Sequence, residues 1–373
     1  MIRLSYPEFK GKLLIDGIGK ILSSGRLSQG RYVERFEYLI AAYLGVKYAV
    51  AVSSGTAALH LALLSLGVDY GDQVIVPSFC FPAVANVVEL CNAKVVFCDI
   101  NPDTLNIDIE KVPEIINRRT KAIIIVHLFG NPVDISKIYS FCRKRNIAII
   151  EDAACALGAV IKNKKCATLG KVGCLSFHPR KIITTGEGGM VVTNDEVIYK
   201  KIKLLRSHGI GSNKGLLLPG FNYRMPEINA LMGIEQISSL ESKVAKRIAL
   251  AESYTRHLSD IANFVFFQKV LPRSIHAYQS YVIMLNNHVL RDRLLSYMIN
   301  HSIESGFGTY AIHCLNYYAK KYKLSELDFP NSYYAFRCSL SLPLHCKIRS
   351  ADIEFISGEI KSFLSRFKNE CAE

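Results

Sequence analysis

The sequence predicts an α/β fold for the first two-thirds of the chain, built on a mainly parallel sheet that is flanked by helices. Short apolar runs alternate with amphipathic stretches, and the apolar runs themselves show no polar–apolar alternation. Strands of this kind are buried on both faces, and helical crossovers between them produce a parallel sheet. The expected strands are 48–52, 73–77, 94–99, 121–127 and 147–152, and the expected helices are 56–66, 82–91, 109–119 and 134–145.

The rest of the chain predicts a smaller α+β domain. A long, charged and amphipathic stretch, 226–258, is typical of a helix that leaves the large domain. Further elements are expected at 277–285, 291–300, 338–343 and 353–367. We therefore expect residues 1–245 to form an N-terminal segment and the large domain, and residues 246–373 to form the small C-terminal domain.

Composition narrows the class of protein. The 373 residues are half apolar and 21% charged, which is typical of a soluble globular protein. The 11 cysteines include no C-x-x-C pair, which favours reduced thiols in a cytoplasmic protein over a disulfide framework or a metal site. The longest uncharged run, 49–68, is interrupted by Ser53, Ser54 and Gly55, and the N-terminus lacks a signal-peptide core. We therefore expect neither a membrane segment nor a bound metal.

The formal net charge of +14 comes from basic residues that are scattered along the chain. No nucleic-acid-binding module accompanies them, so we expect no nucleic-acid partner. The excess positive charge weakly favours a ligand that carries phosphate.

Three local features suggest chemistry, and the first is a strand-to-helix turn. The expected strand 48–52 ends in Ser53, Ser54 and Gly55, and a helix begins at Thr56. The free N–H groups at the start of a helix bind phosphate. The alternative is that the serines serve only as a helix cap.

The second feature is the pair Glu151-Asp152 at the end of the most apolar strand. Ligands of open parallel sheets bind at the carboxyl ends of the strands. A carboxylate buried there needs a cationic partner, unless it is simply the N-cap of a following helix.

The third feature is Lys181, which stands between the short strand GCLSFH and a glycine-rich turn. A lysine held in a constrained loop can act as a nucleophile, whereas most lysines only keep a surface soluble. A phosphate site, a buried carboxylate and a loop lysine are together what pyridoxal phosphate needs. The lysine forms the Schiff base, the carboxylate keeps the pyridine nitrogen protonated, and the helix start holds the phosphate.

The chain as a whole resembles the DegT/DnrJ/EryC1/StrS sugar aminotransferases, which are fold-type-I pyridoxal-phosphate enzymes. The resemblance covers nearly the whole chain. It rests on the segments GRLSQGRYVERFE, YLGVKYAVAVSSGTAALHLAL, GDQVIVPSFCF, EDAACALGA, SFHPRKIITTGEGGMVVTND, RSHG, FNYRMPEINALMGIEQ and SLSLPLH. It implies the fold-type-I architecture, with a large cofactor-binding domain and a smaller C-terminal domain.

The resemblance also implies roles for single residues. Lys181 matches the Schiff-base lysine and Asp152 the partner of the pyridine nitrogen. Gly55 and Thr56 match the backbone part of the phosphate site, and Ser176 matches the hydroxyl that completes it.

Four further matches concern the rim of the site. Phe81 falls where an aromatic ring stacks on the cofactor, although a core phenylalanine is the alternative. Asn222 matches an asparagine that reaches the phosphate of the neighbouring subunit. Tyr310 and His313 fall in a region that faces the sugar nucleotide, although His313 could equally be an ordinary loop histidine.

One position departs from the family pattern. Cys155 stands where many members carry Gln or His beside the 3-hydroxyl of the cofactor. The match places Cys155 in the cofactor site. Because a thiol is a poor hydrogen-bond donor, it does not tell how the ring oxygen is held.

The resemblance implies a homodimeric aminotransferase with active sites shared between subunits. Glutamate is the expected amino donor, and a nucleotide-linked keto-6-deoxy sugar is the expected acceptor, at C-4 or alternatively at C-3. The product would serve lipopolysaccharide O-antigen, other surface polysaccharide or glycoside biosynthesis. One alternative is a pyridoxal-phosphate-dependent sugar dehydratase, against which Lys181 argues because those enzymes carry histidine there. The other is a non-catalytic regulatory member of the same fold.

Overall fold

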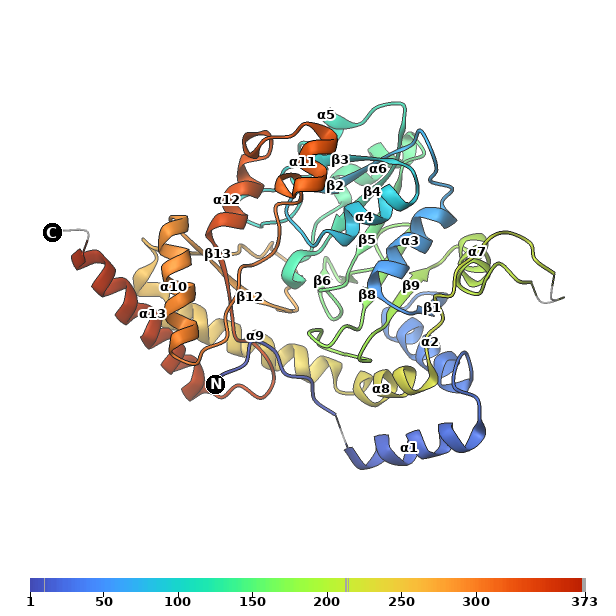
Figure 1. Ribbon diagram of the computed structural model, residues 1–373, viewed down its shortest axis with the longest axis horizontal. Coiled ribbons are helices and arrows are strands. Elements are labelled where there is room, and N and C mark those ends of the chain that lie inside the picture. Colours follow the sequence, from blue (N-terminus) through green and yellow to red (C-terminus); the bar gives the residue numbers. More distant parts are fainter. Residues whose placement is uncertain (10, 212, 214, 371–373) are drawn as a thin grey trace.

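The computed structural model describes residues 1–9, 11–211, 213 and 215–370 (Figure 1). In these residues a seven-stranded sheet with the order β1-β9-β8-β5-β4-β2-β3 forms the centre of the large domain. The pairs β3–β2, β2–β4, β4–β5 and β5–β8 are parallel, and β9 is antiparallel to both of its neighbours. The fold is α/β with a mostly parallel sheet, as predicted.

The strands of the large sheet are β1 (Tyr48–Val52), β2 (Gln73–Pro77), β3 (Lys94–Cys98), β4 (Thr120–Val126), β5 (Ala148–Asp152), β8 (Val172–Ser176) and β9 (Gly189–Thr193). An antiparallel sheet in the small domain consists of β10 (Val265–Phe267), β12 (Tyr281–Leu285) and β13 (Ser339–Leu342). A third sheet consists of β11 (Ser274–Ile275), β6 (Val160–Ile161) and β7 (Lys164–Lys165).

The helices up to the domain connection are α1 (Gly11–Ser24), α2 (Arg31–Leu44), α3 (Gly55–Ser65), α4 (Ala83–Leu90), α5 (Val112–Ile115), α6 (Ser136–Lys144) and α7 (Glu196–Arg206). The later ones are α8 (Glu227–Ile237), α9 (Leu240–His257), α10 (His288–Asn300), α11 (Asn316–Tyr322), α12 (Pro330–Cys338) and α13 (Ser350–Glu370). Short 3-10 turns are η1 (Leu128–Gly130), η2 (Ser259–Ile261), η3 (Ile312–Cys314) and η4 (Glu326–Asp328). None of the helices in the described residues combines the length and the apolar character that a bilayer crossing requires.

The central sheet is buried on both faces because its side chains alternate between two helical layers. In β4, Ile124 and Val126 join the cluster formed with α3, α4 and α7, whereas Ile123 and Ile125 join the cluster formed with α5 and α6. Successive side chains of a strand point to opposite faces, so continuous apolar runs produce this three-layer arrangement.

Two predicted helices differ from the structure. The helix predicted at 109–119 is reduced to the single turn α5. Instead of continuing the helix, the side-chain oxygen of Asn117 accepts from the N–H of Arg119, and the N–H of Asn117 donates to the Thr120 hydroxyl. The long helix predicted at 226–258 is two helices, α8 and α9. They are separated near Ser239, whose hydroxyl donates to the carbonyl of Gln236 at 2.9 Å.

Strand β9 was not predicted, and it sets the geometry at the ends of β1 and β8. Gly189 pairs with Val52 on one side and with Ser176 on the other. A Cβ atom at Gly189 would lie 2.3 Å from the carbonyl oxygen of Ser54, so only glycine allows this close approach. The turn that follows β1 is thereby held beside Ser176.

Helices α11 and α12 follow β12 in the sequence but pack on the large domain. Tyr318 and Ala335 belong to the same apolar cluster as Phe97 of β3, and the Tyr322 hydroxyl donates to Glu89 of α4 at 2.7 Å. The predicted division at residue 245 therefore does not describe the packing of the segment 311–338.

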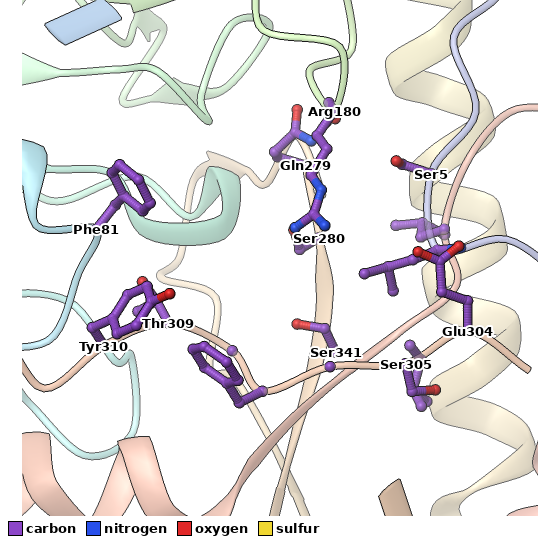
Figure 2. A pocket seen from close by; sticks show the side chains of 16 residues that line it. Ser5, Phe81, Arg180, Gln279, Ser280, Glu304, Ser305, Thr309, Tyr310 and Ser341 are labelled. Atoms are coloured by element: carbon purple, nitrogen blue, oxygen red, sulfur yellow. The ribbon is translucent and has the colours of Figure 1, made fainter. Parts of the chain in front are cut away.

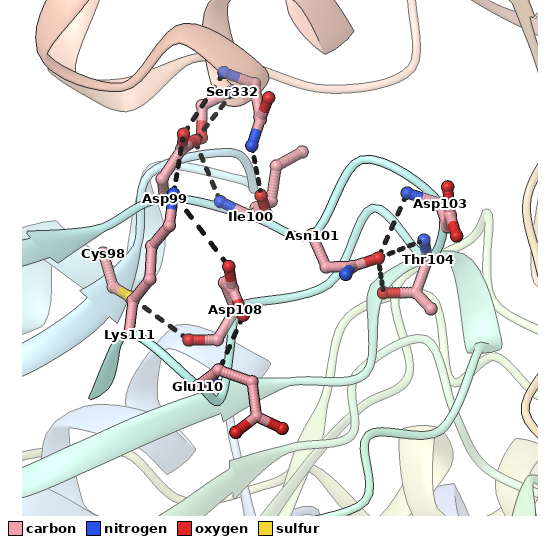
Figure 3. Close-up of polar contacts among 11 residues, drawn as sticks. Cys98, Asp99, Ile100, Asn101, Asp103, Thr104, Asp108, Glu110, Lys111 and Ser332 are labelled. Carbon is pink, nitrogen blue, oxygen red and sulfur yellow. Dashed lines mark hydrogen bonds and ion pairs between the residues drawn. The ribbon is translucent and has the colours of Figure 1, made fainter. Parts of the chain in front are cut away.

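Asp99 fixes this segment to the end of β3 (Figure 3). Its carboxylate is 5% exposed and accepts hydrogen bonds from the N–H and the hydroxyl of Ser332, at 2.9 and 2.7 Å, and from the N–H of Asn331. Because these N–H groups lie in the first turn of α12, Asp99 caps that helix from the end of β3.

Glu227 plays a similar part for α2. Its carboxylate is 2% exposed and accepts from the N–H groups of Gly30, Tyr32 and Val33 at 2.8, 3.0 and 3.0 Å. The N-terminus of α2 is therefore capped by the first residue of α8, which joins the N-terminal segment to the helices that lead to the small domain (Figure 1).

We expect Glu227→Ala to lower the free energy of unfolding by roughly 3 kcal/mol, because it leaves three N–H groups of a buried helix start without an acceptor. Denaturant unfolding at a fixed protein concentration measures the change. Glu235→Ala on the same helix is the control, since Glu235 bonds no side chain in the described part of the chain, and it should change stability by less than about 0.5 kcal/mol. Equal midpoints for the two variants would contradict this role of Glu227.

Candidate active site

The predicted site residues meet at one edge of the central sheet. Asp152 and Ser176 are the last residues of the parallel neighbours β5 and β8, and Gly55 is the first residue of α3. Lys181 follows β8 by five residues, in the loop that leads to β9. This edge is where the carboxyl ends of the parallel strands lie, the usual ligand position in open α/β sheets.

A site for an anion lies at the start of α3. The Ser54 hydroxyl accepts from the N–H of Ala57 at 3.0 Å, and the N–H groups of Gly55 and Thr56 have no acceptor within the described ranges. A Cβ atom at Gly55 would lie 2.8 Å from Cβ and 3.2 Å from Oγ of Ser176, so the serine side chain directly faces the helix start. Free N–H groups, a helix dipole and a hydroxyl together fit a phosphate group.

Asp152 is a buried carboxylate with few partners of its own. It is 8% exposed, and burial raises its pKa, against which the N–H of Ala154 and the positive charge of Lys181 act. One carboxylate oxygen accepts from the N–H of Ala154 at 3.0 Å, and no helix starts there, so the N-cap interpretation is wrong. A buried carboxylate in this state is stabilised by a cationic N–H donor, and a protonated pyridine ring provides one.

Lys181 is half-buried, and its Nζ lies 3.1 Å from Sγ of Cys155. The structure therefore brings Cys155, three residues after Asp152, to the reactive end of the lysine. The residues at this edge fit pyridoxal phosphate: the helix start for its phosphate, Asp152 for its ring nitrogen and Lys181 for its aldehyde carbon.

A cavity of about 310 Å³ opens beside these residues, between the two domains (Figure 2). Phe81 and Tyr310 lie on one side of it, and Ser5 and Glu304 lie on the opposite side. Phe81 is 64% exposed, and its ring centroid is 6.2 Å from that of Tyr310, so the alternative of a core phenylalanine is wrong. Polar groups that line the cavity are Ser5, Arg180, Gln279, Ser280, Glu304, Ser305, Thr309 and Ser341.

The beginning of the chain forms one wall of this cavity. The N–H of Leu4 donates to the Glu304 carboxylate at 2.9 Å, and the carbonyl of Leu4 accepts from the N–H of Leu344 at 3.2 Å. These bonds hold Ser5 at the cavity and occupy part of the Glu304 carboxylate.

His313 does not reach the cavity. It is 0% exposed, its Nδ1 lies 2.5 Å from the Ser78 hydroxyl, and its Nε2 lies 3.1 Å from Sγ of Cys314. The expectation that His313 contacts substrate is therefore not met, because core packing and the bond to Ser78 hold the ring inside the protein. It is a buried core histidine.

Asn222 is exposed, and its side-chain oxygen accepts from Nε of Arg224 at 3.0 Å. The carbonyl of the next residue, Tyr223, accepts from the N–H of Ser53 at 2.9 Å, so the segment lies beside the end of β1. The role of Asn222 toward a second subunit stays a prediction.

Two residues of the site carry no motif that the sequence could reveal. Gln279 hydrogen-bonds the backbone on both sides of Lys181. Arg180 lines the cavity, and its guanidinium has no partner in the described part of the chain. The role of Gln279 depends on contacts made after folding, and only the position of Arg180 next to Lys181 could have drawn attention to Arg180.

Comparisons with known proteins agree with this geometry. Residues 10–361 match the model of the DegT/DnrJ/EryC1/StrS aminotransferase family. The chain is 37% identical over 341 residues to a GDP-perosamine synthase of Caulobacter vibrioides, covering 90% of this chain and 91% of the relative. The solved structure of the aminotransferase TlmJ from Streptoalloteichus hindustanus superposes with a TM-score of 0.92 at 29% identity, covering 99% of this chain and 100% of that one.

An Escherichia coli GDP-4-keto-6-deoxy-D-mannose-3-dehydratase with bound hydrated pyridoxal phosphate is also similar, with a TM-score of 0.89 at 27% identity over 96% of this chain and 99% of that one. The family match extends over nearly the whole chain and includes Gly55, Asp152, Ser176 and Lys181. The chain belongs to the DegT/DnrJ/EryC1/StrS family, and it is a pyridoxal-phosphate-dependent aminotransferase.

Proposed function

We propose that this aminotransferase moves the amino group of glutamate to a nucleotide-linked keto-6-deoxy sugar, at C-4, with C-3 as the alternative position. The observation that carries the proposal is the meeting of Lys181, Asp152 and the anion site of Gly55 and Ser176 beside an interdomain cavity with many hydroxyl groups. The relative named GDP-perosamine synthase supports a GDP-linked sugar as acceptor. The unpartnered Arg180 beside Lys181 supports a donor that carries a carboxylate.

The residues of the site have separate roles in cofactor binding and in proton transfer. Bound pyridoxal phosphate supplies an electron sink that makes the carbon bonded to the amino group acidic. The N–H groups of Gly55 and Thr56 and the Ser176 hydroxyl would hold its phosphate, and the Asp152 carboxylate would keep a proton at its ring nitrogen. Nζ of Lys181, placed beside Cys155, would be the base that accepts the proton of the amino-bearing carbon and the acid that later gives it up.

The cavity positions the acceptor and keeps water away from the reacting atoms. The exposed ring of Phe81, with Tyr310 packed edge-on against it, would cover the cofactor ring. The hydroxyls of Ser280 and Ser341 are suited to hydrogen bonds with a sugar. We further propose a homodimer with shared active sites, acting in the cytoplasm to make an amino sugar for O-antigen or related glycosides. The free thiols of the described cysteines support a reducing compartment.

A labelled-donor experiment tests the acceptor and separates this function from dehydration. The enzyme is incubated with ¹⁵N-glutamate and a panel of nucleotide-linked 3-keto and 4-keto-6-deoxy sugars, and products are analysed by mass spectrometry and NMR. We expect ¹⁵N in the product, with the position read from its coupling to the ring carbons. Loss of water without ¹⁵N incorporation would instead identify a dehydratase, and no reaction with any sugar would support a regulatory protein.

Lys181→Ala should abolish both the absorption band of the bound cofactor and its loss on adding glutamate, because it removes the amine that lies beside Cys155 in the site. Absorption spectra of the purified variant with added cofactor measure this. Lys164→Ala, on an exposed strand remote from the site, is the control and should behave as wild type. Near-wild-type turnover by Lys181→Ala would end the assignment.

Asp152→Asn should lower turnover by at least about 100-fold, since removal of a buried charge partner costs roughly 3–5 kcal/mol. Steady-state turnover per bound cofactor is the measurement, so that weaker binding is not mistaken for slower chemistry. Asp134→Asn removes a surface carboxylate that pairs with Lys162, and it should change turnover less than about twofold. A loss of tenfold or less in Asp152→Asn would contradict its role at the ring nitrogen.

The shared site makes a complementation prediction. In a mixed dimer of Lys181→Ala and Asn222→Ala subunits, both lesions fall in one site if Asn222 serves the partner's cofactor, and the other site stays intact. Mixing the two poorly active variants should therefore restore activity toward one working site per mixed dimer. Differently tagged subunits verify that mixed dimers have formed. If these mixed dimers recover no activity, Asn222 does not serve the cofactor of the partner subunit.

A further inference from the structure

The backbone of Lys181 is held by a single side chain from a distant part of the sequence. Nε2 of Gln279 donates to the carbonyl of Arg180 at 2.5 Å, and Oε1 of Gln279 accepts from the N–H of Ile182 at 3.0 Å. These two groups belong to the peptide units on either side of the Lys181 Cα atom. The N–H of Lys181 also donates to the carbonyl of His178 at 2.8 Å, and the Gln279 amide bonds both flanking peptide units. Together these bonds fix both backbone dihedrals of Lys181, and with them the direction in which its side chain leaves the loop.

Only a side chain with a donor and an acceptor at this reach can make both bonds. The carbonyl of Arg180 needs an N–H donor, and the N–H of Ile182 needs an acceptor, which a glutamine amide supplies together. A glutamate of the same length keeps the acceptor and, when ionised, loses the donor. Gln279 is 7% exposed, so water does not readily replace a lost bond.

Gln279 is itself held firmly in place. Nε and Nη2 of Arg247, on α9, donate to the carbonyls of Tyr278 and Gln279, both at 2.7 Å. Burial lowers the pKa of Arg247 to about 10, and its guanidinium is 5% exposed. On the other side, the N–H of Ala277 donates to the carbonyl of Gly130 at 3.0 Å. The segment is thus fixed from the large domain and from the connecting helix before it enters β12.

We propose that Gln279 is a positioning residue that orients Lys181 toward the cofactor. It lies in the cavity wall beside Arg180 (Figure 2), but it acts through the two peptide groups rather than on reacting atoms. The flexible stem of a lysine reaches a defined point only if its Cα–Cβ direction is fixed. The inference rests on Lys181 being the reacting amine of the proposed function.

The structure supplies a matched control for the test. Gln236 of α8 holds Thr184 of the same loop in the same manner: its Oε1 accepts from the N–H of Thr184 at 3.2 Å, and its Nε2 donates to the carbonyl of Thr184 at 2.6 Å. Gln236 is 3% exposed. Gln236→Met and Gln279→Met therefore remove equivalent bonds from the loop, but only the second removes them next to Lys181.

The test measures how fast the apoenzyme captures pyridoxal phosphate, a reading that needs neither donor nor acceptor substrate. The rate of appearance of the bound-cofactor absorption is followed at increasing cofactor concentration, and borohydride reduction with peptide mapping verifies the link to Lys181. The limiting rate reports attack by the lysine, and the half-saturating concentration reports binding at the anion site. We expect Gln279→Met to lower the limiting rate at least about tenfold, with half-saturation within about twofold of wild type.

Gln279→Glu adds a pH dependence of the limiting capture rate, which a general loss of stability would not produce. Protonation of the glutamate restores an O–H donor toward Arg180, so its deficit should be smaller at about pH 6 than at about pH 8, whereas the deficit of Gln279→Met should not vary. This variant also keeps the test valid if Gln279→Met fails to fold.

Limiting rates within about twofold of wild type in the Gln279 variants would overturn the proposal, and so would an equal loss in Gln236→Met. A wild-type protein that captures the cofactor but does not respond to glutamate would contradict the proposed function instead, and would leave the role of Gln279 to be decided by the capture rates.

Discussion

Glu151 is a fully buried carboxylate around which the cofactor-binding edge of the sheet is assembled. It accepts hydrogen bonds from Nε2 of His127 at 2.8 Å and from the N–H groups of Ala167, Leu169 and Gly170 at 2.9, 2.6 and 2.6 Å. One side chain thus joins the end of β4, the end of β5 and the loop that leads into β8. Because four donors surround it, the negative charge is compensated within the protein.

The next residue of the strand, Asp152, differs from Glu151 in the number of hydrogen bonds that its carboxylate accepts. Asp152 points to the opposite face of the sheet and accepts one backbone hydrogen bond, from Ala154. The protein therefore satisfies Glu151 completely and leaves Asp152 for a ligand. The backbone of His127 ties the two together, since its N–H donates to the carbonyl of Asp152 at 3.1 Å while its ring bonds Glu151. Strain or loss at Glu151 would move Asp152 as well.

Much of the fold and part of the site could be predicted because they depend on local patterns. Five strands follow from continuous apolar runs, and Lys181 follows from its place between a strand and a glycine-rich turn. Elements governed by side-chain bonds to the backbone were missed, such as the end of the helix predicted at 109–119, which Asn117 stops. Residues whose role depends on distant partners could not be predicted either. Gln279 meets Lys181 only in the folded chain, and the buried ring of His313 bonds Ser78, 235 positions away.

The bond between Leu4 and Glu304 joins residues 300 positions apart, and Leu4 is bonded in turn to Leu344. The cofactor-binding edge, by contrast, is built from the first half of the chain. During synthesis the residues of the sheet edge are therefore made before the residues that complete the cavity wall. A growing chain has its anion site, Asp152 and Lys181 long before residues 304–344 leave the ribosome, and contacts of such long sequence separation are the slowest to form. The cavity proposed for the sugar depends on these late contacts, so the cofactor groups of a nascent chain precede the proposed place of the acceptor.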